Sequence, residues 1–144
     1  MLRPARLILI LLTVAALALL ALHLAFGQPG RQVQRYGSVI GVRSEKVAEY
    51  RHLHAKVWPG VLHRLRECHI RNYSIYFKEI EPGKYYLFSY YEYTGTDFAK
   101  DAAELAADPD IRAWWKLTDP CQFPVPLHKP GENWAGMEEV FHTE

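Results

Sequence analysis

The chain has 144 residues, with 17 Lys and Arg against 16 Asp and Glu, a formal net charge of +1 and two cysteines. This length suits one compact domain, and a charge so close to zero argues against a nucleic-acid partner, which would need a basic surface. Two cysteines cannot make a disulfide framework, and we expect Cys68 and Cys121 to be free thiols.

The first feature in chain order is an apolar stretch from Leu7 to Phe26 that carries no formal charge. Its length of about 20 residues matches a bilayer-spanning helix, and the two arginines before it favour a cytoplasmic N-terminus. A cleavable signal peptide is the alternative, because Ala25-Phe26-Gly27 offers a cleavage site. Residues 1–27 are therefore predicted to be a membrane anchor or a signal peptide. The domain would then lie outside the cytoplasm, anchored to the membrane or secreted.

Residues 28–35 are polar and contain Pro and Gly, which is typical of a linker. The domain of residues 36–144 then opens with a short β-branched segment, Tyr36–Val42, which we predict to be a strand. Ser44 is a candidate N-cap for the helix that follows. Apolar and aromatic residues recur there every three or four positions from Val47 to Leu65, the pattern of an amphipathic helix.

Pro59 falls inside this helical pattern and should bend or break the helix near Trp58. The elements expected after it have local signals of their own, namely strand alternation, turn residues or helix caps. They are the strands Asn72–Lys78 and Lys84–Tyr93 joined by a Pro82-Gly83 turn, a helix from Thr96 or Asp97 to Ala107, a helix from Asp108-Pro109 onward, a proline-rich loop over Pro120–Asn133 and a closing strand Met137–Phe141.

The resulting order is β-α-β-β-α-β, which predicts an α+β fold of the ferredoxin-like type. Helices would cover one face of an antiparallel sheet, and the aromatic residues on the other face must be covered as well. A second copy that packs sheet to sheet would do this, so we expect a homodimer in the form of a dimeric α+β barrel.

Tyr50, His54 and Trp58 follow one another at intervals of four residues, so a continuous helix would present them on one face. Such a stripe is either part of the core or the wall of a site, and an imidazole is costly to bury without a partner. His52 points roughly 160° away from His54. No Asp, Glu or Cys at ligand spacing joins the histidines, so no metal site is expected.

Trp114-Trp115 is a second candidate element, since adjacent helical residues point about 100° apart and one indole can pack while the other stays free. A free indole among tyrosines can hold the apolar face of a sugar, although a purely structural pair is equally compatible with the pattern. Glycine-rich phosphate loops, a nucleophile elbow and a CxxC motif are absent from the sequence. Proton transfer on a small neutral ligand fits the residues that remain.

Four motifs, which follow one another along the chain, resemble those of a known protein family. They are E-Y-x-x-x-H-x-x-x-W-P over Glu49–Pro59, N-Y-S-I-Y over Asn72–Tyr76, W-W-K over Trp114–Lys116 and M-E-E-V-F-H over Met137–His142. With them, residues 36–144 resemble the L-rhamnose mutarotase family. The resemblance implies a dimeric ferredoxin-like α+β barrel and an enzyme that interconverts the α and β anomers of a 6-deoxyhexose.

Carried over residue by residue, the resemblance implies that His54 is the catalytic histidine and that Tyr50 and Tyr73 contact the sugar, as does the Trp114-Trp115 pair. His69 stands where the family often has a glycine at the end of the first helix. Opening a hemiacetal needs one proton delivered to the ring oxygen and one removed from the anomeric hydroxyl, and an imidazole can do either near neutral pH. No metal or organic cofactor is required for this reaction.

Two other functions remain open from the residues alone. A membrane-tethered sugar-binding or interaction module could keep the fold without turnover, although a binder has less need of a titrating group at His54. A small heme-dependent or cofactor-free monooxygenase is a third possibility, and it rests on fold analogy only. That chemistry would predict a closed apolar pocket in place of walls rich in hydroxyl groups.

Overall fold

The computed structural model describes residues 33–126 and 128–143. Its elements, in chain order, are β1 (Gln34–Val42), the 3-10 turn η1 (Ser44–Lys46), α2 (Val47–Ala55), α3 (Pro59–Glu67), β2 (Ile70–Glu81), β3 (Lys84–Tyr93), α4 (Phe98–Ala107), α5 (Pro109–Thr118), η2 (Asp119–Cys121), β4 (Gln122–Phe123) and β5 (Ala135–Met137). The order of strands and helices confirms the predicted α+β class.

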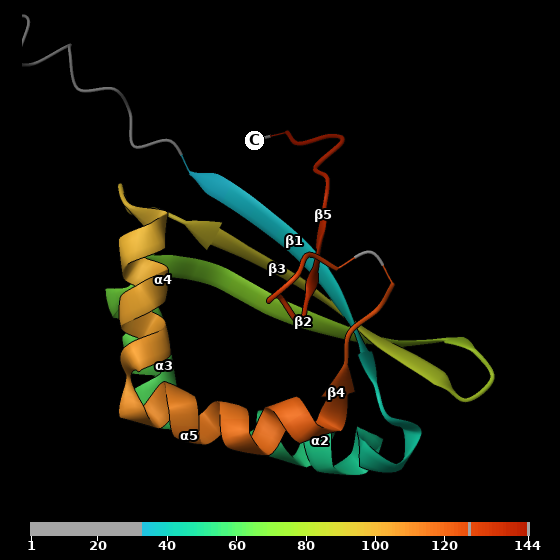
Figure 1. The fold of residues 1–144 in the computed structure, drawn as a ribbon. Coiled ribbons are helices and arrows are strands. Elements are labelled where there is room, and N and C mark those ends of the chain that lie inside the picture. The colour runs from blue at the N-terminus through green and yellow to red at the C-terminus, as the bar shows by residue number, and fades with distance from the viewer. Residues whose placement is uncertain (1–32, 127, 144) are drawn as a thin grey trace, which may run out of the picture. The chain divides into compact units, whose positions relative to one another are not determined.

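The strands form one antiparallel sheet in the order β2-β3-β1-β4, with β5 also paired to β1. The sheet curls, and the four described helices lie on one side of it (Figure 1). The β2-β3 hairpin closes through Pro82-Gly83, where Gly83 has a φ of 75°. That left-handed conformation suits a residue without a Cβ atom, so the predicted turn is confirmed.

Proline divides the first helical region as expected. Helix α2 ends at Ala55, and α3 begins with Pro59 in its first turn. Trp58 is extended, with φ −62° and ψ 138°, because a residue before proline is sterically excluded from helical geometry. Ser44 does not cap this region, since its hydroxyl donates to the Glu45 carboxylate instead. The prediction of Ser44 as an N-cap was therefore wrong.

Two later helices begin where the sequence predicts. The Asp97 carboxylate accepts from the backbone N–H of Lys100 at the start of α4, and Asp108 does the same for Ile111 in α5. The closing strand was misplaced, because β5 covers Ala135–Met137 and residues 138–143 have no regular structure. The predicted strand residues Val140 and Phe141 are 88% and 79% exposed.

The predicted location, anchored in a membrane or secreted, is contradicted. Within residues 33–126 and 128–143 no helix is long and apolar enough to span a bilayer. Helices α4 and α5 have 10 residues each, which is about 15 Å of helix against a hydrocarbon core of about 30 Å. The stretch Leu7–Phe26, on which that prediction rested, lies outside the described residues. So do the predicted N-terminal hydrophobic helix and residues 28–32 of the predicted linker.

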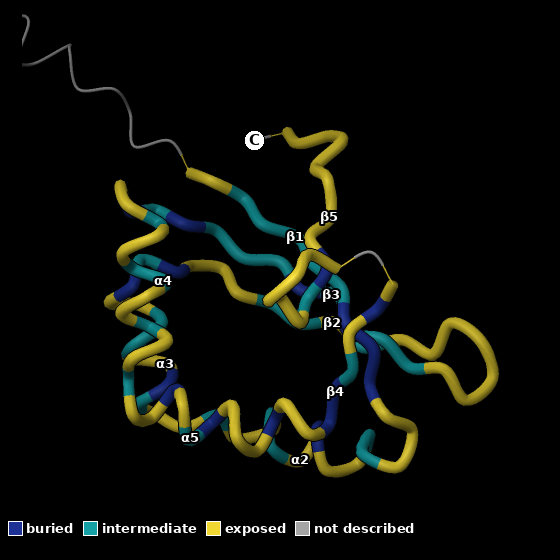
Figure 2. Tube along the Cα trace, viewed as in Figure 1, coloured by how far each residue is buried: buried dark blue, intermediate teal, exposed yellow. Residues whose placement is uncertain are grey.

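The core is made of two buried clusters. Ile40, Val42 and Leu87 of the sheet pack with Tyr50 and Cys121, whereas Val61, Ile111 and Trp114 join α3 to α5. Figure 2 shows these buried segments on the sheet and on the inward sides of the helices. Because the second cluster holds helices to each other and not to the sheet, space remains between the two layers.

Candidate active site

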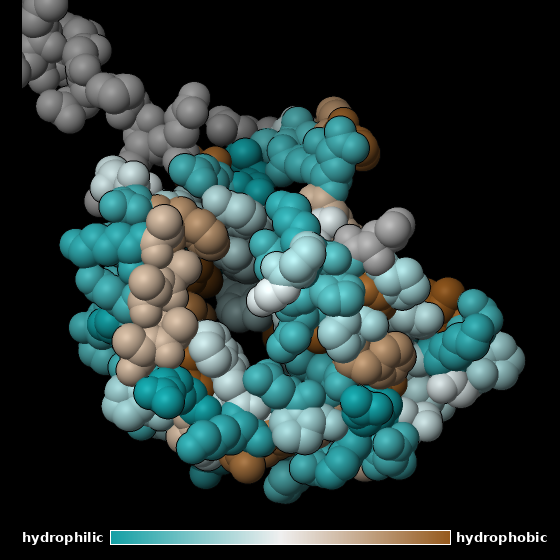
Figure 3. Space-filling view, viewed as in Figure 1, coloured by the Kyte–Doolittle hydropathy of each residue, from teal (hydrophilic) through white to brown (hydrophobic). Residues whose placement is uncertain are grey.

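A cavity of about 800 Å³ lies between the sheet and the helices. The space-filling view shows the molecule hollowed there, with hydrophobic side chains inside the opening (Figure 3). Residues of α2, α3, α4, α5, β2 and β3 line it. They are Tyr50, Arg51, His54, Ala55, Val57, Val61, Leu62, Leu65, Cys68, Ile70, Tyr73, Ile75, Phe77, Leu87, Tyr91, Phe98, Asp101, Ala102, Leu105, Ile111, Trp114 and Trp115. All five sequence-predicted site residues are among them.

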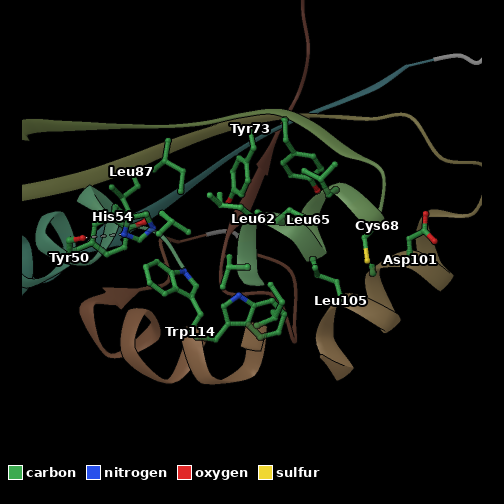
Figure 4. A pocket seen from close by; sticks show the side chains of 18 of the residues that line it. Tyr50, His54, Leu62, Leu65, Cys68, Tyr73, Leu87, Asp101, Leu105 and Trp114 are labelled. Atoms are coloured by element: carbon green, nitrogen blue, oxygen red, sulfur yellow. Dashed lines mark hydrogen bonds between the residues drawn. The ribbon is translucent and has the colours of Figure 1, made fainter. Parts of the chain in front are cut away.

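His54 lies on α2, in the last turn of the helix, and its ring borders the cavity (Figure 4). Its Nδ1 is 3.1 Å from the backbone carbonyl oxygen of Tyr50. A carbonyl can only accept, so Nδ1 must carry the hydrogen and donate it. In the neutral ring Nε2 is then the basic nitrogen, and it has no hydrogen-bond partner among the described residues.

The surroundings of His54 favour its neutral form. Burial lowers its pKa below the ordinary histidine value, and the hydrogen bond to the Tyr50 carbonyl opposes this in part. The ring stacks on Tyr50 with centroids 4.1 Å apart and meets the edge of Trp114 at 5.3 Å. The imidazole is therefore held in orientation on two sides while remaining half-buried at an open cavity.

Tyr50 serves this arrangement mainly through its ring and its carbonyl group. Its side chain is 4% exposed, and its buried hydroxyl makes no hydrogen bond of good geometry within the described chain. Burial raises the pKa of this phenol, and the nearby Gln122 side chain opposes the effect. The hydrogen-bond partner that Tyr50 offers to His54 is thus its backbone carbonyl and not its hydroxyl.

The two adjacent indoles divide as predicted, since Trp114 is 6% exposed and Trp115 is 38% exposed. Trp58 does not continue the stripe of Tyr50 and His54 along one helix, because α2 ends at Ala55. It instead meets Trp114 edge to face, with centroids 5.4 Å apart. Trp114 thus contacts both His54 and Trp58, and an aromatic wall forms around the imidazole.

Tyr73 faces the cavity from β2, on the same side as Ile75 and Phe77, which confirms the predicted alternation. The side chain is 44% exposed. The loss of water around its hydroxyl group nevertheless raises its pKa to about 12. The phenol therefore stays protonated at neutral pH. Its hydroxyl has no partner on the described residues, and its ring meets the edge of Tyr91, 5.6 Å away.

A family model described as L-rhamnose mutarotase matches residues 35–143. The chain belongs to the L-rhamnose mutarotase family. It is 30% identical over 103 residues to the L-rhamnose mutarotase of Flavobacterium johnsoniae, covering 72% of this chain and 89% of that protein. For the L-rhamnose mutarotase of Bacillus subtilis the identity is 28% over 116 residues, with 78% and 100% covered.

Among solved structures, an L-rhamnose mutarotase from Formosa agariphila superposes with a TM-score of 0.56 at 22% identity, over 77% of this chain and 99% of that one. This likeness supports the fold. Membership of the family makes the protein an enzyme that acts on carbohydrate anomers, in the isomerase class.

This mutarotase-family protein carries a polar cluster that the sequence analysis missed. His69 has a φ of 59°, and its Nδ1 lies 2.7 Å from Oδ2 of Asp101. The hydroxyl of Tyr93 donates to the same oxygen. Both bonds lower the pKa of the Asp101 carboxyl. The cluster joins the end of α3 to α4 and β3, and no local pattern pairs residues 32 positions apart.

Cys68 and Cys121 are buried free thiols, as expected. Within residues 33–126 and 128–143 no group of three or more His, Cys, Asp or Glu side chains gathers in a way that could hold a metal ion.

Proposed function

We propose that this protein interconverts the α and β anomers of a 6-deoxyhexose such as L-rhamnose, with His54 as the acid and base. The observation that carries the proposal is the hydrogen bonding of that imidazole, which fixes the position of its proton. Its Nδ1 is committed to the Tyr50 carbonyl, which leaves a basic Nε2 beside the cavity and an indole. Membership of the family supports the same reaction.

The reaction follows from ordinary hemiacetal chemistry. Nε2 of neutral His54 removes the proton of the anomeric hydroxyl, and the bond between the anomeric carbon and the ring oxygen breaks as the ring oxygen takes up a proton. Rotation of the free aldehyde and the reverse steps close the other anomer. Because both oxygens are bonded to one carbon, the same nitrogen can accept the first proton and return it to the second oxygen. The chain gains and loses no proton overall.

The remaining candidate residues would bind and orient the sugar. Tyr73 is protonated and unpaired, so it would donate a hydrogen bond to a sugar oxygen. Trp115 and Trp114 would pack on the apolar face of the pyranose. Tyr50 would touch the sugar and, more importantly, fix the imidazole through stacking and its carbonyl. These roles need neither a metal nor an organic cofactor.

We also propose that the enzyme acts as a homodimer with its sheets packed against each other. Tyr76 and Ile80 of β2 are exposed large hydrophobic side chains. Tyr76 is paired with Phe88 and Phe88 with Val39, a row across the sheet. Burial of such a row against a second copy would remove it from water. Analytical ultracentrifugation of the wild type and of Tyr76→Glu tests this, with a dimer expected only for the wild type.

Saturation-transfer NMR with L-rhamnose and L-fucose tests the function. Enzyme should accelerate exchange between the anomer signals, and His54→Gln should lower the catalysed rate by about 10² to 10⁴-fold. His52→Gln is the matched control, since His52 is exposed on the same helix and does not line the cavity. Sugar binding without faster exchange would replace the proposal by a binding module without turnover.

A further inference from the structure

The cavity is long and has two chemically different ends. Figure 4 shows Tyr50 and His54 at one end, Cys68 and Asp101 at the other, and Tyr73 between them. All of them line the same space of about 800 Å³. Pockets of roughly 300 to 1,000 Å³ hold drug-sized ligands, so this cavity is larger than one deoxyhexose at His54 requires.

The end away from His54 is apolar, and we call it the far end. Its walls come from the last turn of α3, the first residue of β2 and the inward side of α4. They are Leu65, Cys68, Ile70, Phe98, Ala102 and Leu105. Two of these, Leu65 and Leu105, also pack against the buried α3-α5 cluster, so their positions are fixed by the core.

Among the described residues that line the far end, the ionised group is the Asp101 carboxylate, and one of its two oxygens already has two hydrogen-bond partners in the protein. Asp101 Oδ2 accepts from both His69 and Tyr93, and the thiol of Cys68 is kept protonated because burial raises its pKa. A sugar ring placed here would leave its hydroxyl groups without adequate partners, which is costly. The lining suits hydrocarbon, continuous with the sugar end.

We propose that the physiological substrate is a 6-deoxyhexose that carries an apolar O-linked substituent, with the sugar at His54 and the substituent in the far end. This inference rests on the proposed function and names its substrate class. The anomeric hydroxyl and the ring oxygen must stay free for the reaction. The substituent is therefore on O2, O3 or O4, as an alkyl or acyl group.

The test compares L-rhamnose with its 2-O-, 3-O- and 4-O-butyl ethers in the anomer-exchange assay. The matching 2-methoxyethyl ethers are controls of equal shape and greater polarity. At least one butyl ether should have a kcat/KM about tenfold or more above both the parent sugar and its methoxyethyl counterpart, because buried methylene groups bind favourably. Quenching of tryptophan fluorescence measures the binding of each sugar independently of turnover.

Ala102→Phe fills the far end from α4 and should bring the ratio of the butyl to the parent kcat/KM close to one. Ala103→Phe is the matched control, because Ala103 is exposed on the same helix and does not line the cavity. This variant should keep the wild-type ratio. Circular dichroism of both variants establishes that each is folded.

Accelerated exchange of L-rhamnose with no preference for any butyl ether would overturn this inference and leave the proposed function standing. If the protein accelerates the anomer exchange of no sugar, the proposed function fails, and the binding measurements then test the apolar subsite by themselves. Tighter binding of a butyl ether than of its methoxyethyl partner, lost in Ala102→Phe, supports the apolar subsite, and equal binding overturns it. A structure with a segment of a second copy in the far end would overturn it as well.

Discussion

His69 offers a test of the backbone geometry at the end of α3. Its φ of 59° lies in the left-handed region, which costs an L-residue other than glycine roughly 1 to 2 kcal/mol. It follows the C-cap residue Cys68, where glycine is the usual choice. His69→Gly and His69→Ala therefore form an informative pair.

The expected magnitudes follow from two contributions. Either substitution removes the pair with Asp101, in which the His69 side chain is 36% exposed, and a partly exposed pair contributes about 0.2 to 1 kcal/mol. Glycine also relieves the left-handed backbone, whereas alanine keeps the strain. We therefore expect His69→Gly to be as stable as the wild type or more stable, by up to about 2 kcal/mol, and His69→Ala to be about 1 to 2 kcal/mol less stable than His69→Gly.

Urea unfolding at pH 7 measures the free energy of unfolding of both variants. A difference of about 1 kcal/mol corresponds to roughly 4 °C in Tm for a domain of this size. The control pair is at His63, which is exposed inside α3. There alanine should be the more stable by about 1 kcal/mol, because helical φ is negative. A His69→Ala protein as stable as His69→Gly would refute the reasoning.

Three further predictions concern the cavity. The exchange rate should fall as the pH drops, with a midpoint below the usual histidine pKa of about 6.5, because the proposed base is neutral His54 and burial lowers its pKa. The pH profile of His54→Gln should lack this fall in rate. Tyr73→Phe should raise KM about 2- to 10-fold with unchanged urea stability, since the hydroxyl bonds nothing on the described chain. Trp114→Ala should cost about 3 to 5 kcal/mol of stability in urea, whereas Trp115→Ala should weaken mainly sugar binding, measured by NMR titration.

Much of the fold was predictable because its signals are local. The Pro82-Gly83 turn and the aspartate caps at Asp97 and Asp108 each depend on residues within one turn of chain. The closing strand was not, since β5 exists only through its pairing with β1, and apolar residues such as Val140 and Phe141 can be exposed as well as paired.

The candidate site was predictable in its membership and not in its geometry. Spacing and family motifs singled out five side chains that all border the cavity, and their roles there stay predictions. The partner of His54 Nδ1 is a backbone carbonyl, which sequence patterns of side chains do not reveal. The Asp101 cluster depends on a contact between the end of α3 and α4, and the apolar far end depends on how the helices are spaced from the sheet.

The break at Pro59 explains how the aromatic wall around the imidazole is assembled. In an unbroken helix Trp58 would lie one turn beyond His54 and stack along the same axis. Proline instead makes Trp58 extended and starts α3 in a new direction. Trp114 of α5 then meets His54 at 5.3 Å and Trp58 at 5.4 Å, both edge to face. The Trp114 indole thus contacts one residue before the break and one after it. An uninterrupted helix would instead place His54 and Trp58 one above the other on a single face.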